Sequence, residues 1–118
     1  MKKKTVVVID DDDAIRDILT VVLEDSGYNV IQLDDQLKHS YCLAIPNLFV
    51  VDISLGNPDH EGFLQSMKRN SHTASIPVIL TSTGLDLEEK AADWKAQACI
   101  SKPFDLDDLL QKVAILLN

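Results

Sequence analysis

The chain has 118 residues, the size of one domain, so we expect no second domain. Hydrophobic residues make up 46% and charged residues 25%, a balance that excludes a disordered chain. The net charge of −8 disfavours direct binding to nucleic acid, because phosphate groups repel an acidic surface.

The cellular setting is indicated by what the sequence lacks. No apolar run approaches the roughly 18 residues of a membrane span, and the four apolar residues after the basic start are too few for a secretory signal. Cys42 and Cys99 have neither disulfide-framework nor zinc-site spacing. We therefore expect a cytoplasmic protein with no membrane partner.

Five short runs rich in apolar and β-branched residues predict strands. They are Thr5–Ile9, Asn29–Gln32, Leu48–Val51, Val78–Thr81 and Ala98–Ile100. The first, third and fourth runs are almost wholly apolar, which is typical of strands buried on both faces of a parallel sheet.

Segments with helical periodicity follow these runs. In the first segment Gly27 stands where a helix commonly stops. Five apolar residues of this segment form one stripe: Ile15, Ile18, Leu19, Val22 and Leu23. The pattern between Leu33 and Ile45 is the weakest, while Glu61–Asn70 and Asp86–Ala96 fit helices. The last segment has Asp105 as its expected N-cap. Such alternation predicts an α/β fold, a doubly wound parallel sheet with helices on both faces.

Polar side chains follow four of the five runs, where ligands bind in sheets of this kind. The four sets are Asp10 to Asp13, then Asp52, then Thr81 to Thr83, and finally Ser101 to Pro103. If the first and third strands are neighbours, Asp10 or Asp11 lies close to Asp52. Two carboxylates about 4 Å apart repel by roughly 4 kcal/mol at an effective dielectric near 20, so a proton or a divalent cation must relieve them.

Magnesium suits a site built only from oxygen ligands that also holds phosphate. A cation, a carboxylate nucleophile, a hydroxyl and a lysine are what phosphoryl transfer to aspartate requires, with Asp52, Ser82 and Lys102 in the last three roles. Taken singly, each residue has a structural explanation: Asp12 and Asp13 suit a helix N-terminus, Ser82 a turn, and Lys102 an ordinary surface. Only the combination at one sheet edge favours a functional site.

The chain resembles the receiver domain of two-component response regulators over essentially its whole length. The resemblance is carried by the segments VVVIDDDDAIRDIL, FVVDISL, IPVILTST and CISKPF. It implies a single receiver domain over residues 1–118 with a flavodoxin-like fold, five parallel strands in the order 2-1-3-4-5. The Ile15-Arg16 pair fixes the register of the match.

The resemblance also implies residue roles. Asp10 and Asp11 hold Mg²⁺ together with Asp52, the phosphoryl acceptor, and the backbone carbonyl of Ser54. Ser82 is the switch hydroxyl because it stands five residues after a proline, and Thr81 is its rival if the strand is one residue shorter. Lys102 binds the phosphoryl group, and its bond to the following proline is expected to be cis.

Three departures from the family pattern stand out. The loop at residues 56–62 looks two residues longer than usual, which puts partner contacts in doubt. Thr83 replaces a small residue that normally follows the switch hydroxyl. Cys99 occupies a position that usually carries an aromatic ring, so the usual coupling of ring rotation to the hydroxyl cannot operate.

The leading interpretation is a signalling module, not an enzyme beyond its own phosphorylation and dephosphorylation. Its expected partners are a sensor histidine kinase or phosphotransfer protein and a downstream effector protein or output domain. The resemblance also implies a homodimer through the face formed by the fourth helix, the fifth strand and the last helix. The alternatives are a degenerate receiver that works without phosphorylation, and a haloacid-dehalogenase-type phosphatase, in which Asp10 and Asp12 would act but Ala14 departs from the motif.

Overall fold

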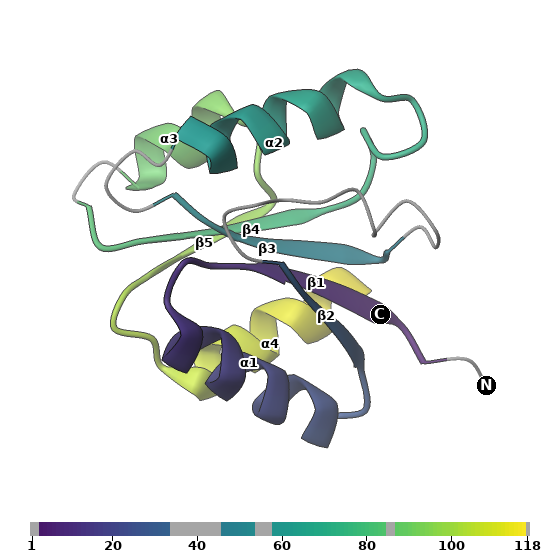
Figure 1. The fold of residues 1–118 in the computed structure, drawn as a ribbon, viewed down its shortest axis with the longest axis vertical. Helices are drawn as coiled ribbons and strands as arrows, with labels where there is room; N and C mark the ends of the chain where they lie inside the picture. The colour runs from purple at the N-terminus through teal and green to yellow at the C-terminus, as the bar shows by residue number, and fades with distance from the viewer. Residues whose placement is uncertain (1–2, 34–45, 54–57, 85–86, 118) are drawn as a thin grey trace.

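The computed structural model describes residues 3–33, 46–53, 58–84 and 87–117. In chain order the elements are β1 Thr5–Ile9, α1 Asp13–Asp25, β2 Asn29–Leu33, β3 Leu48–Asp52, α2 Pro58–Arg69, β4 Val78–Ser82, α3 Leu87–Asp93, β5 Ala98–Ser101 and α4 Leu106–Leu117. The strands form one parallel sheet in the order β2-β1-β3-β4-β5. Helices α2 and α3 cover one face and α1 and α4 the other (Figure 1), which confirms the predicted doubly wound fold.

The sheet separates two apolar cores because successive side chains along a strand point to opposite faces. The core under α1 and α4 contains Val6, Val8, Leu48, Val50, Ile79 and Ile100 from the strands and Leu19, Leu23, Leu109, Val113 and Leu117 from the helices. The core under α2 and α3 takes the alternate strand residues, among them Val7, Ile9, Phe49, Val51, Val78 and Leu80. Each central strand is therefore buried on both sides, as its apolar run predicts.

The strands begin where the sequence predicts, but the later four each extend one residue further. The added residues include Asp52 and Ser82, which end the apolar runs without ending the hydrogen-bonded ladder. The Cα register pairs Asp52 with Thr81, and Ser82 with Ser101. Hydropathy thus marks where the core stops, whereas the parallel pairing carries polar residues out to the edge of the sheet.

The helix boundaries depend on their caps. Asp12 caps α1, and Gly27 follows that helix with a φ of 98°, as its position predicts. Helix α2 starts at Pro58, three residues before the predicted Glu61, because proline suits the first turn of a helix. Helix α3 ends at Asp93 instead of Ala96, since the chain turns through Lys95 with a φ of 55°.

One predicted helical residue and one predicted segment need comment. Ile18 belongs to the apolar stripe of α1 but is 51% exposed. Of that stripe, only Leu19 and Leu23 are buried. The weak pattern between residues 33 and 45 falls almost wholly on residues 34–45, outside the described ranges. In those ranges no helix combines the length and the apolar character that a membrane crossing needs.

Candidate functional site

Three charged side chains meet at the carboxyl edge of the sheet. Each comes two positions after strand residues whose side chains point to one face, so it points to that same face. Asp10 follows Val6 and Val8, Asp52 follows Leu48 and Val50, and Lys102 follows Ala98 and Ile100. Strand β3 lies beside β1 and β4, and β5 lies beside β4. The residues that carry charge therefore stand directly above the core that α1 and α4 cover.

The Lys102 ammonium joins the two carboxylates. Its Nζ donates to Oδ2 of Asp10 at 2.8 Å and lies 3.2 Å from Oδ2 of Asp52. The side chains are 2% exposed for Asp10, 7% for Asp52 and 9% for Lys102, so water screens these charges poorly. Two buried carboxylates thus share one cation, and the trio carries one excess negative charge.

The environment of Asp10 raises the pKa of its carboxyl above the usual 3.8, chiefly because burial removes water from the charged form. The Lys102 ammonium and the Asp12 amide N–H oppose this shift by hydrogen bonding, while the nearby Asp52 carboxylate adds to it. Burial outweighs the favourable contacts. The metal-free site therefore favours binding another positive species, a proton or a cation.

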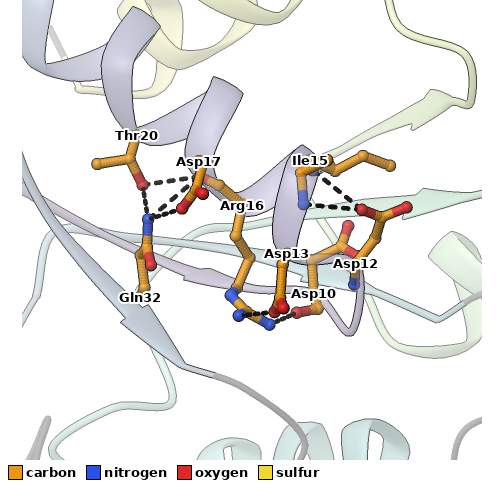
Figure 2. Close-up of polar contacts among 9 residues, drawn as sticks. Asp10, Asp12, Asp13, Ile15, Arg16, Asp17, Thr20 and Gln32 are labelled. Atoms are coloured by element: carbon orange, nitrogen blue, oxygen red, sulfur yellow. Dashed lines mark hydrogen bonds and ion pairs between the residues drawn. The ribbon is translucent and has the colours of Figure 1, made fainter.

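Three of the four consecutive aspartates, Asp10, Asp12 and Asp13, make different contacts (Figure 2). Asp10 is 1% exposed, and its Oδ1 accepts the Asp12 amide N–H at 2.9 Å. Asp12 caps α1 by accepting the amides of Ala14 and Ile15 at 2.9 and 3.2 Å, while Asp13 lies in the first turn. The expectation that Asp12 and Asp13 serve the helix N-terminus is confirmed. Asp11 is exposed at the start of this loop.

Two hydroxyls lie at the end of β4, next to Asp52. Thr81 pairs with Asp52 in register and is 1% exposed; Ser82 is 4% exposed. The Ser82 hydroxyl accepts the amide N–H of Gly84 at 2.9 Å, and its own proton can still be donated to another acceptor. The backbone carbonyl of Ser82 accepts the Lys102 amide at 2.9 Å, which holds the β4 and β5 ends together.

The donor set fits a hard divalent cation in chemistry, although not as a preformed cage. Among the described residues, no three His, Cys, Asp or Glu side chains are grouped closely enough to hold a metal ion. Asp10 and Asp52 nevertheless supply buried oxygen ligands with excess negative charge, which Mg²⁺ prefers. Ser54, the predicted backbone ligand, lies outside the described residues.

A pocket of about 230 Å³ adjoins the site on the side of α1 and α4. Its lining is mostly apolar and consists of Ile15, Ile18, Leu19, Lys102, Pro103, Phe104 and Leu106. The peptide bond between Lys102 and Pro103 is cis, as expected. The Lys102 ammonium, which binds both carboxylates, thus also borders an apolar depression on the surface.

Two of the three departures fall on described residues. Thr83 is exposed. Cys99 is a free, half-buried cysteine that packs against the core under α2 and α3, on the opposite side of the sheet from Asp52. The altered loop falls partly on residues 54–57, outside the described ranges.

Residues 6–114 match the family model of the response regulator receiver domain. The chain belongs to this family. It is therefore a receiver domain of the two-component response regulators, which are signalling modules.

Curated relatives are transcriptional regulators of bacteria. The DNA-binding dual master transcriptional regulator RpaA of Synechocystis sp. is 34% identical over 96% of this chain and 48% of its own length. The transcriptional regulatory protein KdpE of Staphylococcus aureus is 29% identical over 94% of this chain and 48% of its own length. This receiver domain spans about half the length of the curated relatives it matches.

Solved structures show the same fold. The chemotaxis protein CheY4 of Vibrio cholerae superposes with a TM-score of 0.86 and 22% identity, covering 98% of this chain and all of the other. A response regulator structure from Chloroflexus aurantiacus, described as putative, gives 0.85 and 23% identity, covering 98% of each chain. Likeness at this identity concerns the fold alone.

Proposed function

We propose that this receiver domain accepts a phosphoryl group on Asp52 from the phosphohistidine of a sensor histidine kinase or phosphotransfer protein. The observation that carries the proposal is the buried Asp52 carboxylate within 3.2 Å of the Lys102 ammonium. The Asp10 carboxylate, bound to the same ammonium, adds the excess negative charge that recruits a cation. Family membership supports the same role.

In the proposed reaction Asp52 is the nucleophile, and Lys102 and Ser82 act on the transferred group. An Asp52 carboxylate oxygen attacks phosphorus, the bond from phosphorus to the imidazole nitrogen breaks, and the nitrogen keeps the electron pair. An acyl phosphate forms on Asp52. The Lys102 ammonium neutralises charge on the transferred oxygens, and the Ser82 hydroxyl donates its proton to one of them as a hydrogen bond. Thr81 is the rival hydroxyl.

We assign Mg²⁺ binding to Asp10, Asp11, Asp52 and the backbone carbonyl of Ser54. When bound, this ion supplies charge neutralisation at the phosphoryl oxygens. The chain's own contribution is to bury Asp10 and Asp52 and to compensate only one of their charges through Lys102. The reaction should therefore stop when divalent cations are removed.

The phosphoryl donor is proposed to dock over the apolar pocket. Asp52 is 5% exposed, so a protein donor must cover the edge of the sheet to bring its phosphohistidine close. The pocket borders Lys102 and opens beside α1, where Ile18 is 51% exposed. An apolar helix surface of the donor is the occupant that this lining favours.

The surface that contacts the effector is proposed by analogy with the receiver family. Phosphorylation is proposed to switch the face formed by α3, β5 and α4, which contacts an effector protein, an output domain or a second copy of this chain. We propose that this chain itself does not contact nucleic acid, because its net charge is −8. A cytoplasmic setting is the natural one for this chemistry.

Mass spectrometry of the intact protein after incubation with acetyl phosphate and Mg²⁺ tests the function. One added phosphoryl group is expected on the wild type and none on a folded Asp52→Asn variant. Equal labelling of that variant would show that the acceptor is another residue. A wild type that binds Mg²⁺ but takes up no phosphoryl group would instead favour the degenerate receiver.

A further inference from the structure

Arg16 contacts the acidic loop at two points through its guanidinium group (Figure 2). Its Nη1 donates to the backbone carbonyl of Asp10 at 2.7 Å, and its Nη2 pairs with the Asp13 carboxylate. Asp13 is the first residue of α1, whereas Asp10 directly follows the last residue of β1. One side chain thus joins both ends of the turn that contains Asp11.

Arg16 is itself held in place by its helix. The side chain is 13% exposed, and its amide donates to the Asp12 carbonyl at 3.0 Å. The Arg16 carbonyl accepts the Thr20 hydroxyl at 2.7 Å. A rigid base of this kind lets the guanidinium fix the loop, because little conformational freedom remains to be lost.

Strand β2 supports the same helix from the side. The Nε2 of Gln32 lies 2.6 Å from the Thr20 hydroxyl and 3.3 Å from Oδ1 of Asp17. These contacts tie the first turns of α1 to the neighbouring strand. The position of Arg16 relative to Asp10 is therefore set by two elements of the sheet, β1 and β2, as well as by the helix.

The contact geometry and the charge of Arg16 act in opposite directions on cation binding. A positive charge beside four aspartates weakens the local negative potential and disfavours Mg²⁺. The two-point contact instead holds the backbone carbonyl of Asp10, at the start of the turn from which the Asp11 side chain projects. A lysine would keep the charge but lose the planar fork.

From these contacts we infer that Arg16 is a positioning residue for the cation site: it holds the loop so that Asp10 and Asp11 are oriented before Mg²⁺ arrives. The inference rests on the proposed function only for the identity of the cation. The preorganisation itself is a property of the metal-free protein. Its reporter is the amide N–H of Asp12, which donates to Oδ1 of Asp10 within the same loop.

Arg16→Lys and Arg16→Gln test the inference, with Lys112→Gln as the matched control. Lys112 pairs with Asp108 on α4, so its replacement also removes one cation from an ion pair within a helix. Calorimetric titration with Mg²⁺ alone and hydrogen exchange of the Asp12 amide in EDTA are measured for each folded protein. The wild type provides the reference for both.

Both Arg16 variants are expected to bind Mg²⁺ about tenfold more weakly, a loss typical when the support of a metal ligand is removed. Their Asp12 amide should exchange faster, whereas the control should match the wild type in both measurements. Tighter Mg²⁺ binding by Arg16→Gln, with unchanged exchange, would overturn the inference in favour of a purely electrostatic effect. Unchanged values in both variants would also overturn it.

Labelling by acetyl phosphate tests the proposed function, whereas Mg²⁺ affinity and amide exchange test the role of Arg16. If the wild type binds Mg²⁺ but is not labelled by acetyl phosphate, the proposed function fails while the effect of Arg16 on the loop can still be observed. If the wild type is labelled and the Arg16 variants match it in affinity and exchange, only the positioning role fails.

Discussion

The Nζ of Lys102 lies 3.2 Å from Oδ2 of Asp52, although 50 positions separate the two residues in the sequence. The same ammonium donates to Asp10 at 2.8 Å. The lysine therefore compensates two carboxylates, in addition to the phosphoryl contact that the proposed function assigns to it. Its removal should affect stability and chemistry in different ways.

Lys102→Ala should destabilise the metal-free protein by about 3 kcal/mol at pH 7, because two buried carboxylates lose their partner. Saturating Mg²⁺ should restore much of this loss, since a divalent cation relieves the same repulsion. Phosphoryl uptake and the response should fall further than Mg²⁺ affinity does. Urea unfolding with and without Mg²⁺ measures the first effect, and acetyl phosphate labelling the second.

The control for this variant is Lys112→Ala, which removes the partly exposed partner of Asp108 on α4. We expect it to change stability by less than about 1 kcal/mol, as partly exposed ion pairs usually do. A loss in Lys102→Ala that Mg²⁺ leaves untouched would contradict the shared role of the two carboxylates.

Asp10→Asn should stabilise the metal-free protein at pH 7 while weakening Mg²⁺ binding. Burial raises the pKa of the Asp10 carboxyl, so the folded protein holds this proton to higher pH than the unfolded chain does. Because the folded state binds more protons, its stability falls as pH rises from 3.8 through the raised pKa. Asparagine is neutral at every pH, so the Asp10→Asn variant should not lose stability in this way as the pH rises.

Urea unfolding between pH 4 and pH 7 in EDTA checks the effect of Asp10. The wild type should lose stability relative to Asp10→Asn as the pH rises across this interval. A variant that is less stable than the wild type at pH 7 would show that the contacts of Asp10 to Lys102 and to the Asp12 amide outweigh its burial.

Asp12→Ala and Asp11→Ala should separate the two roles within the acidic run. Asp12 accepts two amides of the first turn of α1, so its loss should lower the free energy of unfolding by about 1 kcal/mol. Labelling by acetyl phosphate should stay near that of the wild type. Asp11→Ala should do the reverse, with little change in thermal stability and a large loss of Mg²⁺-dependent labelling.

Ile18→Asp should slow phosphoryl transfer from a phosphorylated kinase that labels the wild type, and leave labelling by acetyl phosphate unchanged. A small donor needs no contact with α1, whereas the proposed protein donor docks over the pocket that Ile18 lines. Ile115→Asp is the control: Ile115 lies on α4 and is 76% exposed, and the variant should behave as the wild type. Equal transfer to both variants would place the donor elsewhere.

Most of the fold could be predicted because its strands are short apolar runs bounded by polar residues. The prediction fell one residue short at Asp52 and Ser82, where side-chain polarity changes but the backbone pairing continues. Pro58 was a readable signal for the start of α2, since proline tolerates the first helical position. The end of α3 depends on the left-handed turn at Lys95, which carries no glycine to reveal it.

The charged residues of the site could be listed from the sequence, but their pairing could not. Strand-end positions placed Asp10, Asp52 and Lys102 at one edge, whereas the shared ammonium follows from side-chain reach and burial in three dimensions. Arg16 entered the sequence analysis only through the register of a motif. Its contacts with the Asp13 carboxylate and the Asp10 carbonyl depend on the conformation of the turn, which no sequence pattern indicated.

The division of the sheet into two cores has a consequence for how the proposed phosphorylation of Asp52 would affect the rest of the molecule. Asp52 stands over one core, while Cys99 and helix α3 pack with the other, and among the described residues no apolar side chain belongs to both cores. Main-chain atoms at the strand ends provide the connection, as in the Lys102 amide that donates to the Ser82 carbonyl at 2.9 Å. Phosphorylation of Asp52 should therefore rotate the peptide groups at the strand ends. A change in the carbonyl chemical shift of Ser82 would register this rotation.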